Sequence, residues 1–333
     1  MPSFDRRKFL GHALMGGTAI AAGAYAPFAR SALNAKVSVA SLGISAYAVA
    51  YYLGMKEGIW AKHDWNITEL LPAAPGGAAV RTIVTGGIPI GEVSATAAFG
   101  AWLVGAPIRI LTLTTRTATE LLFLGMPGTK IANPKDLAGK KIAYTGPGSG
   151  THAAAVLALD TLGLTGKADL VATGGIRQGL ALLERGEVDV APQLESLVKA
   201  TDKYVTVFRV SDLVPKYAYS AIIASESFVQ KDPQHVASFL KAQIEAAERV
   251  QKDPDAAANA WFAATKGLEL PSLTRAIRAL NASQGWISGW DVDAMQASLR
   301  SMELVGQIPS VKGVPLSEML DQTFIDPARR VKL

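Results

Sequence analysis

Cysteine is absent from the 333-residue chain. Its absence excludes disulfide bonds, thiolate catalysis, cysteine-rich metal sites and the lipid-modified cysteine that tethers some exported proteins. A long hydrophobic run is also absent, since no uninterrupted apolar stretch reaches the roughly 18 to 20 residues of a membrane-spanning helix. Hydrophobic residues nevertheless make up 49% of the chain. The composition therefore predicts a soluble globular protein with a sizeable core and enough length for two α/β lobes.

A large excess of positive charge is absent once the first 35 residues are set apart. The formal net charge is +5. The first 35 residues hold four basic side chains (Arg6, Arg7, Lys8 and Arg30) against Asp5, which leaves 29 basic and 27 acidic residues in the rest of the chain. A nucleic-acid-binding surface requires clustered Lys and Arg. We therefore expect no nucleic-acid partner.

The N-terminal segment has the pattern of an export signal. Ser3–Leu10 (SFDRRKFL) resembles the twin-arginine motif, and the mildly apolar, Gly- and Ala-rich stretch Gly11–Ala26 is typical of the middle of such a signal. An ordinary first helix is the alternative, but its glycines would weaken it. We predict that residues 1–35 are a twin-arginine signal peptide that engages the twin-arginine translocase and directs the protein to the periplasm. Cleavage after Ala26 or after Ala35 stays open.

Apolar periodicity and Gly or Pro breaks predict alternating strands and helices from residue 36 onward. The expected strands are 36–40, 66–71, 88–91, 108–111, 121–124, 141–145, 169–172, 188–190 and 204–208. The expected helices are 45–58, 78–84, 95–104, 133–137, 151–162 and 177–184, then 233–251, 254–265, 272–284 and 291–305 in a helical last third. Such alternation argues for right-handed βαβ units around mainly parallel sheets. The pattern of 83–90 recurs at 183–190, which favours two related lobes.

Several segments together resemble one known family. They are Leu53–Trp60 (LGMKEGIW), Gly77–Ala97, Asp136–Ala143 (DLAGKKIA), Gly148–His152 (GSGTH) and Lys252–Ala257 (KDPDAA). Their order and spacing resemble the substrate-binding proteins of nitrate, sulfonate and taurine transporters. That superfamily also includes binding proteins for thiamine pyrimidine precursors. The likeness begins at about residue 36 and continues to the end of the chain.

The resemblance implies a type II periplasmic binding fold. This fold has two α/β lobes joined by two crossing strands, here with a helical C-terminal extension, and its lobes close on a ligand by a hinge motion. Crossings near 114–120 and 216–220 would make lobe 1 from 36–117 and 219–333. Lobe 2 would then be 118–218.

The candidate ligand contacts lie at the starts of predicted helices, where open α/β sheets bind ligands. A helix N-terminus offers free backbone N–H groups to an anion. The residues selected on this ground are Ser45, Tyr47, Gly77, Ser94, Ala95, Thr96, Ser149, Gly150, Thr151 and His152. Simple N-capping by Ser or Thr is the alternative, and it is compatible with ligand contact. For His152, donation to an anionic ligand and packing beneath the loop both stay open.

Four further candidates come from loops and crossings. Arg116, with Thr117 beside it, ends an aliphatic strand and could hold a carboxylate or sulfonate through two parallel hydrogen bonds. A surface or hinge ion pair, for instance with Glu120, is the alternative. Glu195 faces the cleft in the family pattern and could bind an amine or hydroxyl instead. Tyr219, like Tyr47, could form a wall for a flat or apolar group, or pack in the hinge.

Enzymatic motifs are incomplete in this chain. Gly146–Thr151 resembles a phosphate loop, but no Lys-Ser/Thr follows, and it fits neither the dinucleotide pattern nor the nucleophile elbow. A fold relative that makes the thiamine pyrimidine uses a cysteine-rich iron motif, which the lack of cysteine excludes. Related enzymes of menaquinone synthesis are expected in the cytoplasm. His63, His152 and His235 lack metal-ligand spacing. We therefore expect no enzyme, cofactor or metal.

Binding and delivery remain as the expected function. The resemblance implies a monomeric periplasmic component of an ABC importer, with a transmembrane permease and its ATPase as partners. The helix ends and Arg116 favour a small organic anion of the sulfonate or aromatic carboxylate class. A thiamine-type pyrimidine or other heterocycle is the alternative ligand, with Glu195 among its contacts. A periplasmic ligand sensor subunit is the alternative of another class.

Overall fold

The computed structural model describes residues 31–73, 76–131, 133–199 and 203–332. The twin-arginine motif and the apolar stretch after it lie outside the described residues. The first strand, β1 (Leu33–Ala40), begins three residues before the expected one. A cut after Ala35 would therefore remove the first residues of this strand, whereas a cut after Ala26 would leave it whole.

The first sheet has six strands, in the order β11-β4-β10-β3-β1-β2. They are β1, β2 (Trp65–Ala73), β3 (Ile90–Ser94), β4 (Ile108–Thr115), β10 (Ser220–Ser225) and β11 (Trp286–Gly289). Strand β1 runs parallel to β2 and β3, while β10 is antiparallel to β3 and β4. Strand β11 is antiparallel to β4 at the edge. The return of the chain through β10 and β11 thus completes a sheet that the N-terminal part begins.

The second sheet has five strands, in the order β7-β6-β8-β5-β9. They are β5 (Leu121–Gly125), β6 (Lys141–Tyr144), β7 (Asp169–Ala172), β8 (Val190–Leu194) and β9 (Val205–Arg209). Strand β6 is parallel to β7 and β8, and β5 is antiparallel to β8 and β9. The chain crosses between the sheets at 116–120 and 210–219. These segments overlap the expected crossings, while the lobe boundaries at 117/118 and 218/219 stay predictions.

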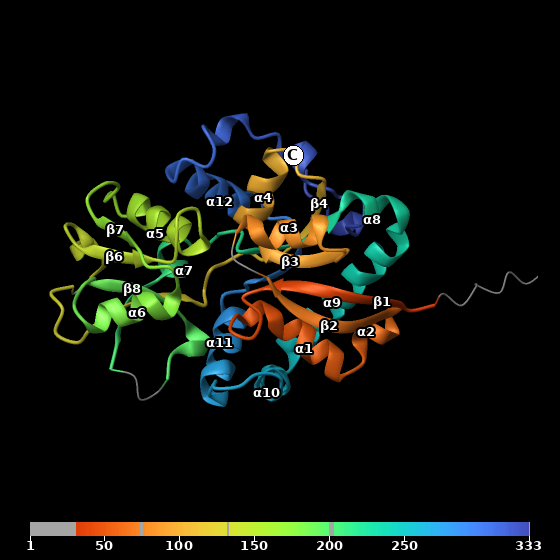
Figure 1. The fold of residues 1–333 in the computed structure, drawn as a ribbon, viewed down its shortest axis with the longest axis horizontal. Coiled ribbons are helices and arrows are strands. Elements are labelled where there is room, and N and C mark those ends of the chain that lie inside the picture. The colour runs from red at the N-terminus through yellow and green to blue at the C-terminus, as the bar shows by residue number, and fades with distance from the viewer. Residues whose placement is uncertain (1–30, 74–75, 132, 200–202, 333) are drawn as a thin grey trace, which may run out of the picture. The chain divides into compact units, whose positions relative to one another are not determined.

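Helices cover both faces of each sheet (Figure 1). Those of the first part are η1 (Ala46–Ala48), α1 (Val49–Lys56), α2 (Ile59–Lys62), α3 (Gly77–Thr85) and α4 (Ala95–Leu103). Those around the second sheet are η2 (Pro134–Leu137), α5 (Gly150–Thr161), α6 (Ile176–Glu184), η3 (Glu195–Leu197) and α7 (Val210–Leu213). The C-terminal part adds α8 (Glu226–Lys231), α9 (Pro233–Lys252), α10 (Pro254–Ala264), α11 (Leu270–Ala282), α12 (Val292–Leu304), η4 (Val311–Gly313), α13 (Leu316–Met319) and η5 (Pro327–Arg329).

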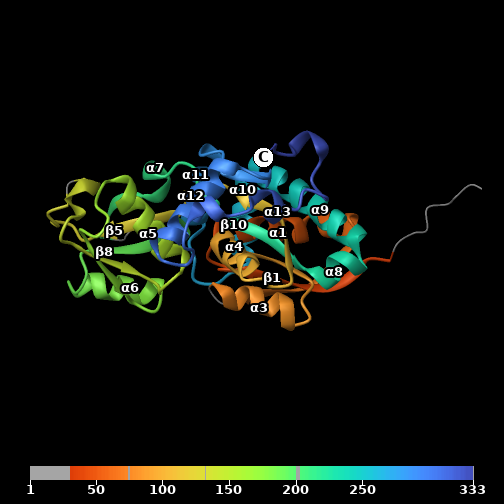
Figure 2. The ribbon, with the colours of Figure 1, turned by 90° about the horizontal axis from the view of Figure 1, so that it is seen from above.

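The apolar core is divided by the sheets. One cluster packs β1 and β2 against α1, α9, α10 and α11, and a second packs the other face against α3, α4 and α12. Figure 2 shows α3 below β1, with α1, α9 and α10 above it. Two further clusters line the second sheet, one with α5 and α7 and one with α6. No helix of the described residues has the length and apolar character to cross a membrane.

Asp-Pro pairs define the long C-terminal helices. The side chain of Asp232 accepts a hydrogen bond from the His235 amide, and Pro233 is the first residue of α9. Asp253 caps α10 in the same way before Pro254. Proline suits this position because its missing N–H would have no partner in the first turn. The two predicted helices at 233–251 and 254–265 are therefore confirmed almost to the residue.

Two expected elements differ in the structure, and one strand was not expected. The single helix expected over 45–58 is η1 and α1, and Gly58 with φ 72° separates it from α2. Strand β11 was not predicted, because its four residues include Ser and Gly. Strand β8 (Val190–Leu194) overlaps the predicted strand 188–190 only at Val190 and continues through Pro192. Proline is tolerated there because β8 pairs with β6 only at Val190, so the missing N–H of Pro192 leaves no ladder bond to β6 unmade.

Gly91 is required where β3 passes close to β1. A Cβ at this position would lie 2.4 Å from the carbonyl oxygen of Ser38 and 2.9 Å from Cδ1 of Ile83. We expect Gly91→Ala to lower the free energy of unfolding by about 2 kcal/mol, because a backbone strand cannot move aside cheaply. Urea unfolding measures the change. Gly313→Ala, whose Cβ would meet open space, is the control, and equal stability of the two variants would contradict this close approach.

Candidate ligand-binding cleft

A cavity of about 530 Å³ lies where loops from both sheets meet. Its lining follows the carboxyl ends of the parallel strands β1, β2, β6 and β7 and continues over β3, β5, β8 and the second crossing. The lining residues are Ala40, Ser41, Ile44, Tyr47, Ala73, Gly76, Ala79, Ser94, Leu121, Thr145–Thr151, Gly174–Gln178, Leu194, Leu197 and Tyr219. Open α/β sheets bind ligands at this edge.

Helix α5 presents its N-terminus to the cavity. The Ser149 side chain caps the helix, with its hydroxyl accepting from the His152 amide at 3.2 Å. The Thr151 hydroxyl accepts from the Thr145 amide at 2.9 Å and so fixes the glycine-rich loop 145–150. No acceptor for the amides of Gly150 and Thr151 is found among the described residues. These two N–H groups are therefore available to an anion.

Helix α6 presents a second N-terminus to the same cavity. It begins after Gly174 and Gly175, and the residues of its first turn, from Ile176 to Gln178, line the cavity. Arg177, in the first turn, is the one charged residue among the described residues that line the cavity. Its exposed guanidinium has no carboxylate partner within the described part of the chain. Two helix dipoles and one guanidinium thus favour negative charge at this end of the cavity.

Aromatic and aliphatic side chains form the rest of the wall. The rings of Tyr47 and Tyr219 meet edge to face with centroids 5.4 Å apart. Burial raises the pKa of both hydroxyls far above their usual value, so the two tyrosines stay neutral at physiological pH. Ile44, Leu121 and Leu194 add apolar surface. The cavity therefore suits a ligand with an apolar body and an anionic group.

Two buried carboxyl groups lie in the first sheet and at the first crossing. Glu120 accepts hydrogen bonds from the Ser45 hydroxyl and, at 2.6 Å, from the Ala46 amide. Glu92 of β3 accepts from the Thr114 hydroxyl at 2.5 Å. Burial raises the pKa of each carboxyl to about 7. Neither group lines the cavity, so both act on the frame around it and not on a ligand directly.

Six of the predicted ligand contacts line the cavity: Tyr47, Ser94, Ser149, Gly150, Thr151 and Tyr219. Eight do not. Ser45 is turned to Glu120, Ala95 is buried in the core, and Gly77 and Thr96 line a different surface cavity. The four remaining residues, Arg116, Thr117, His152 and Glu195, each have a protein partner that explains their position.

Arg116 is part of an ion pair, but not with Glu120. Its Nη1 lies 3.3 Å from Oδ2 of Asp291, and its Nε donates to the Gln284 carbonyl at 3.0 Å. The expected pairing with Glu120 is wrong, because that carboxyl is buried against Ser45 and Ala46. The hydroxyl of Thr117 is bonded to that of Thr119 at 2.8 Å. Both residues therefore stabilise the crossing segment.

His152 and Glu195 are also engaged within the protein. The Nδ1 atom of His152 accepts from the Gly148 amide at 3.1 Å, and its ring stacks on Tyr144 at 4.3 Å. Burial lowers the pKa of His152, which favours the neutral ring. Glu195 is 3% exposed and binds the guanidinium groups of Arg209 and Arg275. Its carboxylate is thereby neutralised inside the protein.

Sequence reasoning missed Arg177, although a local signal was present. The pair Gly174-Gly175 stands before a helix just as Gly148 to Gly150 does, and the latter segment was selected. Ser41 and Ile44 were also missed, since neither starts a helix. Within the described residues, no group of three His, Asp or Glu side chains is arranged to hold a metal ion.

Two mixed α/β sheets, joined by two crossings and enclosing a cleft at their strand ends, define the type II periplasmic binding fold. Solved structures support this assignment. The periplasmic aliphatic sulphonate binding protein SsuA from Escherichia coli aligns with a TM-score of 0.70 and 16% identity over 87% of this chain and 92% of that chain. The alkanesulfonate-binding protein SsuA from Xanthomonas axonopodis pv. citri, bound to MOPS, aligns at 0.66 and 13% over 92% and 100%. The expected fold is confirmed.

An enzyme shares the fold as well. The desulfurization enzyme DszB, as a cysteine-to-serine mutant in complex with biphenyl-2-sulfinic acid, aligns with a TM-score of 0.60 and 16% identity over 87% of this chain and 97% of that chain. No curated protein sequence matches this chain significantly. The family model described as NMT1/THI5 like matches residues 45–257. The chain belongs to this family, as the sequence resemblance implied.

Proposed function

We propose that this protein is the periplasmic solute-binding component of an ABC importer and that it captures a small organic anion, a sulfonate or an aromatic carboxylate. One observation carries the proposal: two helix N-termini and the guanidinium of Arg177, which has no carboxylate partner among the described residues, face a single cavity whose other walls are largely apolar. An anionic head and an apolar body are the chemistry that such a lining recognises. The monomer would pass the ligand to a transmembrane permease driven by its ATPase.

The ligands of similar structures support the anion class. The SsuA proteins are described as binding aliphatic sulphonates or alkanesulfonates, and one of them holds MOPS. The DszB structure holds biphenyl-2-sulfinic acid. All of these are organic sulfur oxyanions with an apolar or ring-bearing body. An anionic group on an apolar body fits this cavity, where the helix starts of α5 and α6 lie beside the aromatic wall of Tyr47 and Tyr219.

Non-covalent binding accounts for the lining better than catalysis does. Among the described residues that line the cavity there is no Asp, Glu, His or Lys side chain. General acid–base chemistry and nucleophile activation most often use such a group near the reacting atoms, and burial raises the pKa of the two tyrosines of the lining far above physiological pH. A ligand that touches both sheets instead favours the closed form, and the closed form docks on the permease. Export through the predicted twin-arginine signal would place the protein where this docking occurs.

A thiamine-type pyrimidine is the less favoured ligand. Its expected polar contact, Glu195, is bound by Arg209 and Arg275 and does not line the cavity. The rings of Tyr47 and Tyr219 suit a flat group, but an aromatic carboxylate presents one too. A periplasmic sensor would use the same cleft. Co-purification with a permease or with a receptor distinguishes transport from sensing.

Thermal unfolding with candidate ligands tests the proposed class. The protein is heated with sulfonates, aromatic carboxylates, nitrate and pyrimidines, because a ligand that binds only the folded state raises the melting temperature. We expect sulfonates or aromatic carboxylates to raise it. A rise with pyrimidines alone would refute the anion class.

Arg177→Ala is expected to weaken binding of the anion at least tenfold, or by about 1.4 kcal/mol, because a charge-assisted hydrogen bond is lost. Calorimetric titration with the sulfonate or carboxylate found above measures the dissociation constant. Arg185→Ala is the matched control, since Arg185 follows the same helix and pairs with Glu187 at the surface. Equal affinities of the Arg177 and Arg185 variants would exclude the guanidinium from the site.

A further inference from the structure

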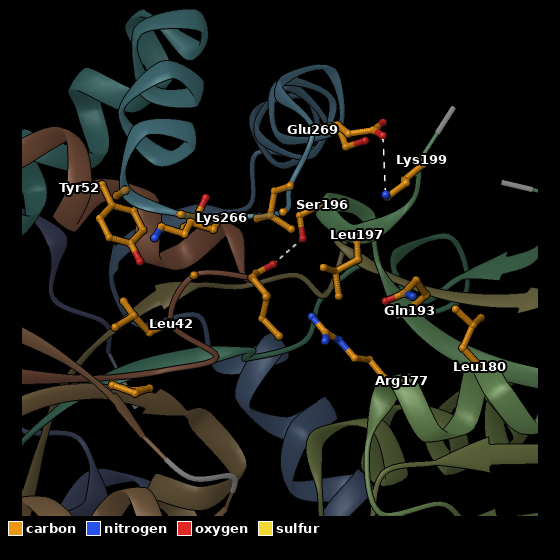
Figure 3. Close-up of a pocket in the computed structure, with 18 residues that line it drawn as sticks. Leu42, Tyr52, Arg177, Leu180, Gln193, Ser196, Leu197, Lys199, Lys266 and Glu269 are labelled. Atoms are coloured by element: carbon orange, nitrogen blue, oxygen red, sulfur yellow. Dashed lines mark hydrogen bonds and ion pairs between the residues drawn. The ribbon is translucent and has the colours of Figure 1, made fainter. Parts of the chain in front are cut away.

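A second cavity of about 560 Å³ adjoins the ligand cavity. The two share Ile44, Arg177 and Leu197 in their linings. The second cavity, here called the outer cavity, extends between α6, the segment after β8 and the loop 264–269 that joins α10 to α11 (Figure 3). The shared residues place the outer cavity directly beside the ligand cavity.

The junction between the cavities is held by the protein itself. The Ser196 hydroxyl donates to the Ile44 carbonyl, which joins η3 to the loop after β1. The indole of Trp261 donates to the Gly43 carbonyl at 3.0 Å and fixes the same loop from α10. In Figure 3 the guanidinium of Arg177 points toward this junction. The boundary between the two cavities is therefore fixed by hydrogen bonds, and Arg177 lies beside it.

The outer cavity carries more positive charge than the protein neutralises. Its charged residues are Arg177, Lys199, Lys266 and Glu269. Lys199 lies 3.9 Å from a carboxylate oxygen of Glu269, which accounts for the one acidic group in this lining. The described part of the chain offers no carboxylate partner to Arg177 or Lys266. Within those residues, two cations without a carboxylate partner thus line the outer cavity.

The remaining outer wall is largely apolar. Leu42, Leu180 and Leu268 contribute to it, together with the ring of Tyr52. A lysine on an open surface is fully solvated by water. A cation at the edge of an apolar concave surface is less well solvated and raises the local concentration of anions. The pattern of the inner cavity, an apolar wall with a cationic end, is therefore repeated in the outer one.

We propose that the outer cavity is a second subsite and that the ligand is an elongated organic dianion. One anionic group binds the amides of α5 and α6, the apolar body passes Ile44 and Leu197, and the second anionic group binds near Lys266. Arg177 lies between the two charged groups and attracts both. This inference rests on the proposed function and specifies its ligand.

A series of matched probes tests the second subsite by calorimetric titration. Benzoate, biphenyl-4-carboxylate and terphenyl-4-carboxylate are compared with the corresponding para-linked dicarboxylates, which vary the distance between the charges. We expect at least one dicarboxylate to bind about ten times more tightly than its monocarboxylate, as a second charge-assisted hydrogen bond would provide. Lys266→Met should remove this advantage and leave the affinity for the monocarboxylate unchanged. Lys241→Met, at an exposed position of α9, controls for net charge.

Each outcome decides between the two proposals. If no dicarboxylate exceeds its monocarboxylate, the second subsite is refuted while the anion-binding function stands. An advantage that survives in Lys266→Met, or that falls equally in Lys241→Met, also refutes it, because the charge would then act from elsewhere. If neither the carboxylates nor the sulfonates bind at all, the proposed function itself fails.

Discussion

Glu195→Ala is expected to lower the free energy of unfolding by about 3 to 5 kcal/mol. Its carboxylate is almost completely buried, and it binds Arg209 of β9 at 2.5 Å and Arg275 of α11. Removing it leaves the guanidinium groups of Arg209 and Arg275 without this shared counter-charge. It also removes the ion pairs that join β9 and α11, while the hydrogen bond from Arg275 to the Val198 carbonyl remains. Urea unfolding followed by circular dichroism measures the loss.

Two variants keep this expectation testable. Glu187→Ala removes a carboxylate whose pair with Arg185 is exposed, and it should cost less than about 1 kcal/mol. Glu195→Gln keeps the shape of the side chain and serves if the alanine variant fails to fold. A loss below about 1 kcal/mol in both Glu195 variants would show that the two arginines do not depend on this carboxylate.

The free energy of unfolding should fall as the pH rises from about 4.5 to about 7, because the carboxyl of Glu92 ionises in the unfolded chain but stays protonated where it is buried in the folded protein. Burial raises the pKa of Glu92 from 4.5 to about 7 in the folded protein. Below the lower pH both the folded and the unfolded chain hold the proton, and the full stability is present. Between the two values only the unfolded chain releases it, which favours unfolding by about 3 kcal/mol at the upper end. Above about pH 7 the contribution of this group stays constant.

Glu92→Gln removes this titration because the amide is neutral at every pH. We therefore expect the variant to gain stability relative to the parent as the pH rises, with the difference complete near pH 7 to about 8. Taking the difference cancels the titration of groups that do not interact with Glu92, such as His152. Glu120 interacts with Glu92 and raises its pKa, so a smaller part of the difference comes from Glu120. Urea unfolding at intervals across this range measures it, with the exposed Glu318→Gln as control. A difference independent of pH would show that Glu92 is ionised throughout.

The fold was largely predictable because its signals are local. Glycine stops, Asp-Pro helix starts and alternating aliphatic residues lie within a few positions of one another. Strand β11 and the Pro192 part of β8 were not predictable, since their conformation depends on pairing with β4 and β5. The order of strands in a mixed sheet likewise depends on contacts between distant segments.

The site residues at helix starts were predictable from the sequence. The roles of the charged residues were not, because a charged side chain can form an ion pair with a residue far away in the sequence. Ser149 to Thr151 line the cavity because a glycine-rich helix start is a local feature. Arg116 finds Asp291 at a sequence separation of 175, and Glu195 finds Arg275 at a separation of 80. No rule based on the spacing of residues in the sequence predicts contacts at such separations. A charged side chain in a loop therefore shows its role only after the chain has folded.

The position of β10 sets the order in which the molecule can assemble. This strand lies between β3 and β4, in the middle of the first sheet, yet it follows every strand of the second sheet in the chain. During synthesis the second sheet can form as soon as β9 has emerged, while β3 and β4 must wait for β10 with their facing edges unpaired. The first lobe thus becomes native only when the chain is nearly complete. The predicted twin-arginine signal resembles those of a route for proteins that fold before they cross, and such a route would export the first sheet only after these strand edges are paired.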